Sequence, residues 1–419
     1  MNDVIVIGGG PAGSTAATLL ARKGFSVLLL ERDRFPRFQI GESLLPYNND
    51  LFARLGVAEK LKLGDFFPKY GAQFVTGDGK IEYTFQFDRT LPPEYHSSFQ
   101  VKRAEFDEML LRNASTAGVD VREQTSVASV DLSDPSRAIV QTSTGDRHEA
   151  RFVLDASGHG AVLGHRVGEK ADVDSLKKVA FFAHYRGVPR AEGRNAGNTV
   201  IVVLQNAWFW MIPVDKELTS VGLVVDRDHV RTCGLDSEEL LKRTIAATPW
   251  VAERMLNAQR VTQVYVRRDF SYRMKRIVGE NYALIGDAAG FLDPIFSTGV
   301  FIAMKSADIA STAVEARLRN GGMRLLKRYQ RDMSNVLERY FRFISNFYRR
   351  EFLEVFLQPG EHFGLLPVII GVLAGNVFTK KWDRMKLGLF FALVAIQKRK
   401  QVIAPPIVWD ALPAAASSV

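Results

Sequence analysis

The residues best suited to chemistry stand near the start of the chain. Gly8, Gly10 and Gly13 form the pattern G-x-G-x-x-G directly after an apolar segment, Asp3–Ile7. The first glycine allows a tight turn, the second lets backbone approach a pyrophosphate, and the third lets a helix pack closely on a strand. Glu31 follows 23 residues after Gly8, where a carboxylate can accept hydrogen bonds from a ribose. This spacing indicates a dinucleotide-binding site.

The elements that must position these residues surround them in the sequence. Pro11 and Ala12 lead into a helix expected over Ser14–Lys23, and a second strand is expected at Ser26–Leu30. The N-terminus of such a helix offers free N–H groups and a partial positive charge to phosphates. A basic loop follows the second strand, and we choose Arg37 from it as a further cofactor contact. The unit favours an α/β fold with a Rossmann-like domain.

Two later segments are expected to complete this sheet. Arg151–Leu154 is predicted as a strand that ends at Asp155, and Tyr282–Ile285 as a strand that ends at Gly286 and Asp287. Because ligands of open α/β sheets bind beyond the carboxyl ends of the strands, we expect the chemistry there. The strands of an interleaved β-rich region are expected at Val179–Arg186, Thr199–Gln205, Trp208–Pro213 and Ser220–Val225, with a hairpin of Gly71–Thr76 and Ile81–Phe87. The main helices are expected at Leu51–Leu63, Ala104–Ala117, Ser237–Met255 and Gly299–Leu318.

The composition limits the class of protein. The 419 residues are 47% apolar and 24% charged, as in globular proteins. The single cysteine, Cys233, excludes an intramolecular disulfide framework and fits a cytoplasmic location, and we expect no signal peptide. The seven histidines are scattered without the spacing of metal ligands, so we expect no metal site.

The net charge of +9 comes from one region. Residues 322–402 contain 15 Lys and Arg against 6 Asp and Glu, and the rest of the chain is balanced, which argues against nucleic-acid binding. The longest apolar run there, Gly364–Gly375, is too short to cross a bilayer, because crossing takes about 20 residues. We favour helices packed over the interleaved sheet. Docking to an acidic carrier protein and peripheral membrane contact through this C-terminal region are the alternatives.

Four motifs occur in a recognisable order. They are GGGPAG at residues 8–13, Arg103 before a Phe-Asp helix, Asp155-Ala-Ser-Gly, and Gly286-Asp287-Ala-Ala-Gly. Over residues 1–320 this set resembles the FAD-dependent monooxygenase superfamily. The resemblance implies a p-hydroxybenzoate hydroxylase-like fold that binds FAD across two domains, with Asp287 at the ribityl or pyrophosphate region. Taken singly, Gly286-Asp287 could be a turn and Asp155 a helix cap.

The expected domain division is discontinuous. Residues 1–175 and 265–320 would form the FAD-binding domain, with a substrate-side hairpin at 70–100. Residues 176–264 would form the β-rich sheet of the substrate domain, and residues 321–419 a C-terminal helical region that is basic and apolar.

Two further motifs indicate a branch of this superfamily. Residues 208–213, Trp-Phe-Trp-Met-Ile-Pro, match W-x-W-x-I-P, the signature of flavin-dependent halogenases. Lys69 resembles the catalytic lysine of the phenol- and pyrrole-acting members. In that family, reduced FAD and O2 oxidise a halide to hypohalous acid, and the lysine passes the halogen to an electron-rich ring. That role needs a desolvated lysine with some neutral amine, whereas most lysines are solvated at the surface.

The segment Asp293–Gly299 resembles the loop that binds halide in these enzymes. The implied halide-binding residues are Ser297, Thr298 and Gly299, at the N-terminus of a helix that supplies N–H donors. Phe296 stands where the tryptophan-acting members carry glutamate, so free tryptophan is not the expected substrate.

The tryptophans of the signature have two interpretations. Trp208 and Trp210 are two residues apart in a predicted strand, so their side chains point to the same side. The resemblance implies a gating wall, completed by Pro213, that keeps substrate from the flavin. A buried pair of core aromatics is the alternative.

The expected cofactors are FAD and either chloride or bromide. The chain has no second complete nucleotide fingerprint, so we expect a separate flavin reductase to supply reduced FAD. The expected substrate is a phenol, a pyrrole or a related ring, either free or bound to an acyl-carrier protein. The alternatives are an FAD-dependent monooxygenase, a geranylgeranyl reductase-like enzyme acting on a lipid, and a flavoprotein that only binds a partner.

Overall fold

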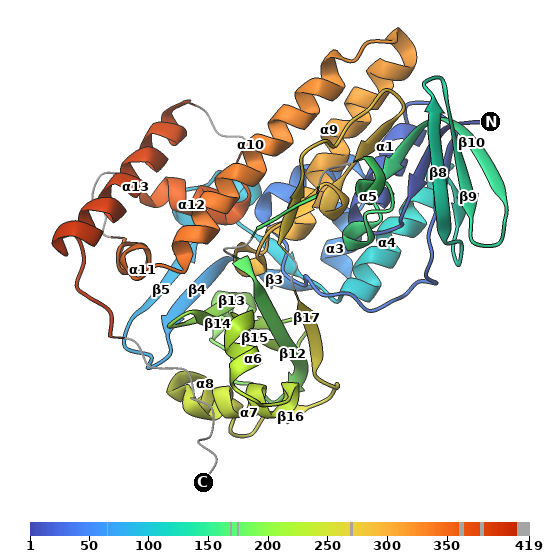
Figure 1. Cartoon of the computed structure of the whole chain (residues 1–419). Helices are drawn as coiled ribbons and strands as arrows, with labels where there is room; N and C mark the ends of the chain where they lie inside the picture. Colours follow the sequence, from blue (N-terminus) through green and yellow to red (C-terminus); the bar gives the residue numbers. More distant parts are fainter. Residues whose placement is uncertain are drawn as a thin grey trace.

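The computed structural model describes residues 1–64, 66–167, 170–173, 176–268, 271–359, 364–377 and 381–408. Figure 1 shows one sheet near the N-terminus, a second sheet below it, and two long helices that lead to the C-terminal helices. The expected α/β class with a Rossmann-like unit and C-terminal helices is confirmed. Two parts of the predicted domain division lie outside the described residues, namely the limit at residue 175 and the last residues, 409–419.

The first sheet carries the glycine-rich loop. Ile7 at the end of β1 pairs in parallel with Asp155, and Asp155 pairs with Leu284, so three strands end side by side. This confirms that the two distant segments complete the sheet. Its strands, in spatial order, are β7 (Asp120–Arg122), β2 (Val27–Leu30), β1 (Asn2–Ile7), β10 (Arg147–Asp155), β9 (Arg137–Thr142) and β8 (Val127–Asp134), with β19 (Tyr282–Leu284) also paired to β10.

The second sheet combines the interleaved region with the earlier hairpin. The hairpin joins through a parallel pairing of Thr199–Val203 with Ala72–Thr76. Every predicted strand of this sheet is present with ends within two residues of the prediction. The strands, in spatial order, are β16 (Gln259–Arg260), β12 (Lys178–Arg186), β15 (Leu218–Asp226), β14 (Ala207–Pro213), β13 (Thr199–Leu204), β4 (Gly71–Thr76) and β5 (Glu82–Gln86), with β17 (Tyr265–Arg268) beside β12.

Smaller elements lie around the junction of the two sheets. Antiparallel strands β3 (Phe67–Lys69) and β6 (Ser98–Gln100) form a short ladder between them. A further small sheet has the order β11 (Lys170–Asp172), β18 (Tyr272–Met274) and β20 (Gly290–Phe291). The helices of these parts are α1 (Pro11–Ala21), α4 (Arg103–Thr116), α5 (Gly164–Val167) and α6 (Arg227–Thr232).

Two predicted helices are each divided in the structure. The helix expected at 51–63 is α2 (Asn49–Arg54) and α3 (Ala58–Leu63), because Gly56 between them has a positive φ of 69°. The helix expected at 237–255 is α7 (Ser237–Ala247) and α8 (Pro249–Met255). Proline lacks the N–H that would continue the first helix and is well placed to start the second.

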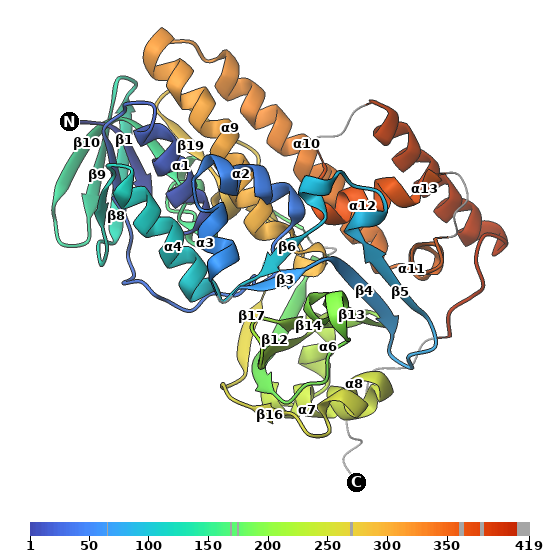
Figure 2. The ribbon, with the colours of Figure 1, turned by 180° about the vertical axis from the view of Figure 1, so that it is seen from behind.

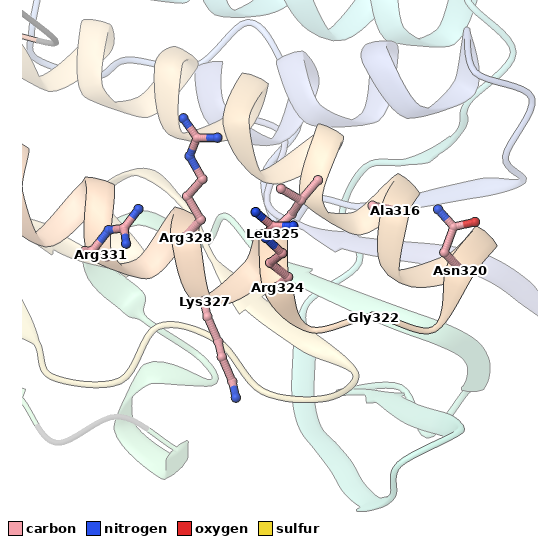
Figure 3. Close-up of a pocket in the computed structure, with 8 residues that line it drawn as sticks. All are labelled: Ala316, Asn320, Gly322, Arg324, Leu325, Lys327, Arg328 and Arg331. Atoms are coloured by element: carbon pink, nitrogen blue, oxygen red, sulfur yellow. The ribbon is translucent and has the colours of Figure 1, made fainter.

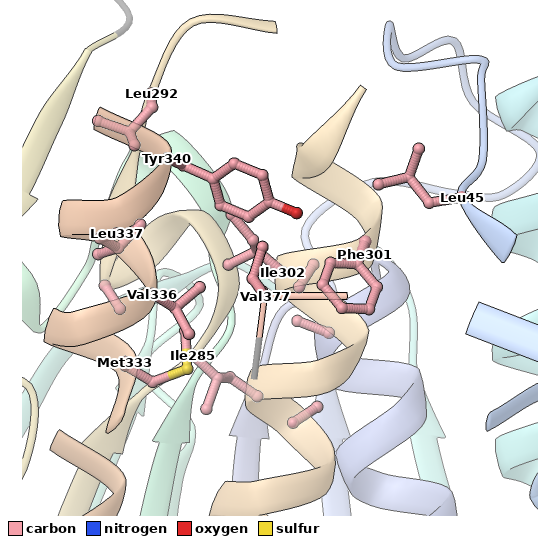
Figure 4. Close-up of a cluster of buried hydrophobic side chains, with 14 of the residues drawn as sticks. Leu45, Ile285, Leu292, Phe301, Ile302, Met333, Val336, Leu337, Tyr340 and Val377 are labelled. Carbon is pink, nitrogen blue, oxygen red and sulfur yellow. The ribbon is translucent and has the colours of Figure 1, made fainter. Parts of the chain in front are cut away.

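Two long helices set the position of the loop at residues 293–299. Helix α9 (Thr298–Asn320) and helix α10 (Arg324–Phe347) run side by side after a turn at Gly321 (Figures 1 and 2). Figure 4 shows apolar side chains between them, including Ile302 of α9 and Val336 and Tyr340 of α10. This packing holds the N-terminus of α9 at the junction of the sheets.

The C-terminal helices pack on the hairpin β4–β5. They are α11 (Arg350–Leu357), α12 (Leu366–Ala374) and α13 (Lys381–Lys400). The Phe356 ring centroid lies 4.9 Å from those of both Phe74 and Phe85, and Phe352 contacts Phe390 of α13 at 5.4 Å. The C-terminal helices therefore lie against the second sheet at its hairpin strands, β4 and β5. Among the described residues no helix is both long and apolar enough to cross a membrane.

Candidate active site

The glycine-rich loop needs glycine at two of its positions, Gly8 and Gly13. A Cβ atom at Gly13 would lie 1.8 Å from the carbonyl oxygen of Gly8, and one at Gly8 would lie 2.5 Å from that of Ala156. Gly8 also has a φ of 101°, which L side chains rarely adopt. At Gly10 a Cβ would meet only Arg37 Nη2, at 3.5 Å. This open side, at the N-terminus of α1, suits a pyrophosphate.

Glu31 braces this loop. Its Oε2 accepts a hydrogen bond from the Gly9 N–H at 2.6 Å, and its Oε1 accepts one from the Asp33 N–H at 2.8 Å. The side chain is buried. Besides the predicted ribose contact, Glu31 therefore stabilises the glycine-rich loop by connecting it to the end of β2 through hydrogen bonds.

The two predicted arginines meet at one buried carboxylate, that of Asp107. Arg103 donates to both Asp107 oxygens, at 2.7 and 2.8 Å, and to the carbonyl oxygen of Ile40 at 2.7 Å. Arg37 donates to the same carboxylate at 3.1 Å and remains partly exposed beside Gly10. Arg103 therefore holds the loop that begins at Ile40, whereas Arg37 can still reach a phosphate.

The two predicted aspartates have different surroundings. Asp155 is buried and accepts hydrogen bonds from the N–H groups of Ser157 and Leu163 at 2.9 and 2.7 Å. Burial raises the pKa of its carboxyl. Asp155 therefore holds the loop that follows β10, whereas the N-cap of the next short helix, Gly158–Gly160, is Ser157. The Asp287 carboxylate is partly exposed, with His159 Nδ1 at 3.4 Å. A Cβ at Gly286 would lie 3.0 Å from that of Ala12, so this turn sits against the start of α1.

Lys69 is buried, as the predicted role demands. Its side chain belongs to β3 and is 2% exposed. Nζ donates to Ser43 Oγ at 2.9 Å and lies 3.4 Å from the Leu44 carbonyl oxygen. Burial lowers the pKa of this amine to about 7. No carboxylate pairs with it among the described residues, so a neutral population exists near pH 7.

A network of neutral polar groups surrounds this lysine. Ser43 Oγ lies 2.9 Å from Thr199 Oγ1, which also accepts a hydrogen bond from Gln100 Nε2 at 2.9 Å. The sequence analysis missed these three residues. Ser43 follows Gly41 in the conspicuous segment Gly-Glu-Ser, but nothing in the sequence marks Thr199 or Gln100.

Some buried polar atoms near Lys69 lack partners within the described part of the chain. They are Ser98 Oγ, Gln100 Oε1 and Glu42 Oε2. Ser98 is the cross-strand partner of Lys69 in the β3–β6 ladder. Buried polar atoms are nearly always hydrogen-bonded in folded proteins. Their grouping here indicates a place for a polar ligand or ordered water.

The signature tryptophans lie on one face of β14. Their ring centroids are 5.8 Å apart, and both belong to the main core, whereas Phe209 belongs to the core on the other face. The predicted common orientation is confirmed. A Cβ at Gly222 would lie 2.1 Å from the Trp210 ring, so this glycine on β15 makes room for the indole. Trp208 Nε1 donates to the hydroxyl oxygen of Tyr348 at 2.8 Å.

The predicted halide-binding residues form the start of α9. Ser297 has left-handed backbone angles, φ 56° and ψ 31°, and its side chain does not cap the helix. Thr298 and Gly299 occupy the first turn, where N–H groups have no partner within a helix. Asp293 is buried and stabilises the approach to this turn, because its Oδ1 accepts the N–H of Ile295 at 3.1 Å. Such a helix start can bind an anion.

The site residues thus form two groups. One gathers around residues 40–44, which contact Arg103 and Lys69. The other gathers around Asp293–Gly299, which is linked to Trp208 through Tyr348. A separate pocket of 560 Å³, shown in Figure 3, lies at the α9–α10 turn among four basic residues, including Arg324 and Arg328. It lies at the opposite end of α9 from residues 293–299, about 33 Å away at 1.5 Å per residue, and is not part of the site.

The chain is similar to known proteins over most of its length. The family model described as "Tryptophan halogenase" matches residues 3–94 and 88–352. A 1H-pyrrole-2-carbonyl-(peptidyl-carrier protein) chlorinase of Pseudomonas fluorescens is 29% identical over 430 residues, 96% of this chain and 93% of that protein. The corresponding brominase of Pseudoalteromonas luteoviolacea is 33% identical over 339 residues, 80% of this chain and 82% of that protein.

Solved structures show the same likeness. The flavin-dependent brominase Bmp2 superposes with a TM-score of 0.83 at 29% identity, covering 96% of this chain and all of that one. The myxobacterial chondrochloren halogenase CndH, an FAD-dependent halogenase, has a TM-score of 0.77 at 36% identity, with 82% and 81% covered.

Proposed function

The chain belongs to the tryptophan halogenase family, and from this premise we propose that it halogenates an electron-rich pyrrole or phenol carried on an acyl-carrier protein. It is a flavin-dependent halogenase that uses FAD with chloride or bromide. The observation that supports the proposed chemistry best is the burial of Lys69, with a pKa lowered to about 7. An amine in this state can be neutral at physiological pH, and it can hold hypohalous acid by a hydrogen bond and present its electrophilic halogen to the substrate.

In this proposal the glycine cradle and its neighbours hold FAD. The pyrophosphate would lie over Gly10 at the N-terminus of α1, within reach of Arg37, and the Asp287 carboxylate would contact the ribityl chain. Asp155 and Arg103 act indirectly, by bracing the loops on either side. Bound FAD in its reduced form, together with O2, would supply the oxidising power that converts halide into hypohalous acid.

The remaining steps belong to this chain's own residues. The N–H groups of Thr298 and Gly299 hold the halide, because the start of α9 offers unpaired donors and a partial positive charge. Trp208 and Trp210 form an apolar wall that keeps the aromatic substrate apart from the site of oxidation. Lys69 holds hypohalous acid by a hydrogen bond and presents its halogen to the substrate ring. The ring carbon forms the carbon–halogen bond, the halogen–oxygen bond breaks to release water, and the ring loses its proton.

The carrier-bound substrate is proposed from the relatives. Two of them act on a pyrrole carbonyl attached to a peptidyl-carrier protein. The net positive charge of residues 322–402 would attract an acidic carrier protein. We further propose that a separate flavin reductase delivers reduced FAD. A cytoplasmic location is proposed because Cys233 is a free thiol.

A single assay tests this function. The protein, FAD, a flavin reductase and NADH are incubated in air with chloride or bromide. The substrates are pyrrole-2-carbonyl on a carrier protein, the free pyrrole acid and a panel of phenols. We expect halogenated carrier-bound pyrrole, recognised by its isotope pattern. Products from the free rings alone would remove the carrier from the proposal, and hydroxylated products without halogen would contradict the proposal as a whole.

Replacing Ser43 by alanine tests the polar network around the amine. Halogenation by the wild-type protein should rise with pH through about 7, because the neutral form of Lys69 dominates above that pKa. Ser43→Ala removes a hydroxyl that accepts a hydrogen bond from the ammonium form, so the pKa should fall and the pH profile should move to lower pH. We also expect about a tenfold lower kcat, since the amine loses its orientation. An unchanged profile would show that Ser43 does not tune Lys69.

A further inference from the structure

Tyr348 joins two motifs of the candidate site that are separate in the sequence, the tryptophan signature and the segment Asp293–Gly299. It follows α10, in a region that neither motif includes. Its hydroxyl oxygen accepts a hydrogen bond from Trp208 Nε1 at 2.8 Å, and the same hydroxyl donates to Asp293 Oδ2 at 2.6 Å. One hydroxyl group therefore connects the tryptophan signature of β14 with the loop before α9.

We propose that Tyr348 is a positioning residue for halide binding, which holds Asp293 so that Thr298 and Gly299 present their N–H groups in the required direction. This inference rests on the proposed halide site. Through its hydrogen bond with Trp208, the same hydroxyl also fixes the orientation of one tryptophan of the apolar wall formed by Trp208 and Trp210. The C-terminal helical region thereby takes part in the reaction without contacting halide or substrate.

The backbone of the loop explains why it needs such support. Ser297 adopts the left-handed conformation, which is unfavourable for a residue other than glycine and persists only where the surroundings maintain it. Asp293 provides part of this support, because its Oδ1 caps the N–H of Ile295 at 3.1 Å. The other oxygen of this fully buried carboxyl depends on Tyr348. Without the hydroxyl, that oxygen would be buried and unpaired, which favours rearrangement of the loop.

The aromatic ring of Tyr348 is held separately from its hydroxyl. Lys178 Nζ lies 3.6 Å from the ring centroid and is itself paired with Asp226 at 2.6 Å. The neighbouring Phe347 ring makes an edge contact with Tyr348 at 5.9 Å. A phenylalanine at position 348 should keep these contacts. The substitution Tyr348→Phe therefore removes only the two hydrogen bonds.

The test compares Tyr348→Phe with the wild-type protein, both full-length and loaded with FAD. Chloride and bromide are titrated while the flavin absorbance is followed, and kcat and the halide KM are then measured. We expect the halide Kd and KM to rise about tenfold, the effect typical of losing a hydrogen bond to a charged group. The FAD Kd and the kcat at saturating halide should stay within about twofold, because neither involves the loop directly.

Two further variants complete the test. Tyr340→Phe is the matched control, because this tyrosine of α10 is fully buried and its hydroxyl has no partner in the described part of the chain. It should bind halide like the wild type. Trp208→Phe removes the other hydrogen bond of the Tyr348 hydroxyl and should raise the halide Kd about threefold, a weaker effect in the same direction.

Three results would overturn the inference in distinguishable ways. A halide Kd of Tyr348→Phe equal to that of the wild type would show that the hydroxyl does not position the loop. A parallel loss of FAD affinity would show that Tyr348 has only a general structural role. Absence of any halide effect on the wild-type protein would instead contradict the proposed halide site itself.

Discussion

Replacing Lys69 by methionine should abolish halogenation while oxygen consumption continues. The amine is the only group that the proposal places between hypohalous acid and the substrate ring. We expect the yield of halogenated product to fall at least about 10³-fold, or about 4 kcal/mol in the barrier. Hypohalous acid should escape into solution, where a chlorination-sensitive dye detects it. The FAD Kd, measured in parallel, should be unchanged.

Lys69→Arg is the matched control for charge. Arginine keeps the positive charge and the length of the side chain but has no neutral form at accessible pH. If a neutral amine is required, this variant should be as inactive as the methionine variant. Substantial halogenation by Lys69→Arg would show that a cationic hydrogen-bond donor is sufficient, and the pKa argument would fail.

The same methionine variant should be more stable than the wild type. The unfolded lysine has an ordinary pKa of 10.5, whereas burial lowers the folded value to about 7. Between these two values the unfolded chain binds more protons, so wild-type stability rises with pH, and below pH 7 the full penalty remains. Lys69→Met should therefore raise the free energy of unfolding by about 1–4 kcal/mol at or below pH 7. The gain should shrink toward pH 10.5 in denaturant titrations.

Replacing Gly13 by alanine should eliminate FAD binding. The new Cβ would lie 1.8 Å from the carbonyl oxygen of Gly8, a backbone atom that cannot yield without opening the turn. Both the cradle and the start of α1 would be displaced. We expect an FAD Kd at least about 100-fold higher, or about 2.7 kcal/mol, together with a lower unfolding temperature of the apoprotein.

The variant Gly10→Ala tests FAD binding separately from the stability of the fold. Its Cβ would meet only Arg37 Nη2, at an ordinary 3.5 Å, so the apoprotein should unfold at the wild-type temperature. The added methyl group would nevertheless occupy the side of the loop that is proposed to face the pyrophosphate. FAD binding should weaken without loss of stability. Wild-type FAD affinity in both glycine variants would place the cofactor elsewhere.

The local sequence pattern was sufficient for the elements that carry the motifs. The strands around the tryptophan signature were predicted to within two residues, because alternation of apolar residues is a local property. The glycine-rich loop was equally predictable, because its backbone can be formed by few other residues. The two divided helices were missed because one glycine or proline interrupted an otherwise helical pattern.

Long-range pairing could not be predicted in the same way. Thr199 and Gln100 come to the Lys69 site from separate strands, and Tyr348 comes from the C-terminal region. Their residue types are common and their spacing follows no motif. Only the packing of β13, β6 and α10 around the junction makes them part of the site.

The sequence by itself determined the glycine-rich loop and the ends of the strands around the tryptophan signature, because each depends on residues close together in the chain. The roles of Lys69, the tryptophans and residues 293–299 stay predictions from the family resemblance. Tertiary structure alone decided that Lys69 is desolvated, that Asp155 and Arg103 brace loops, and that one tyrosine hydroxyl joins two motifs. The physical reason is that burial and hydrogen-bond partners depend on which distant segments pack together. The residue type alone does not reveal whether a lysine or a tyrosine side chain is solvated or buried.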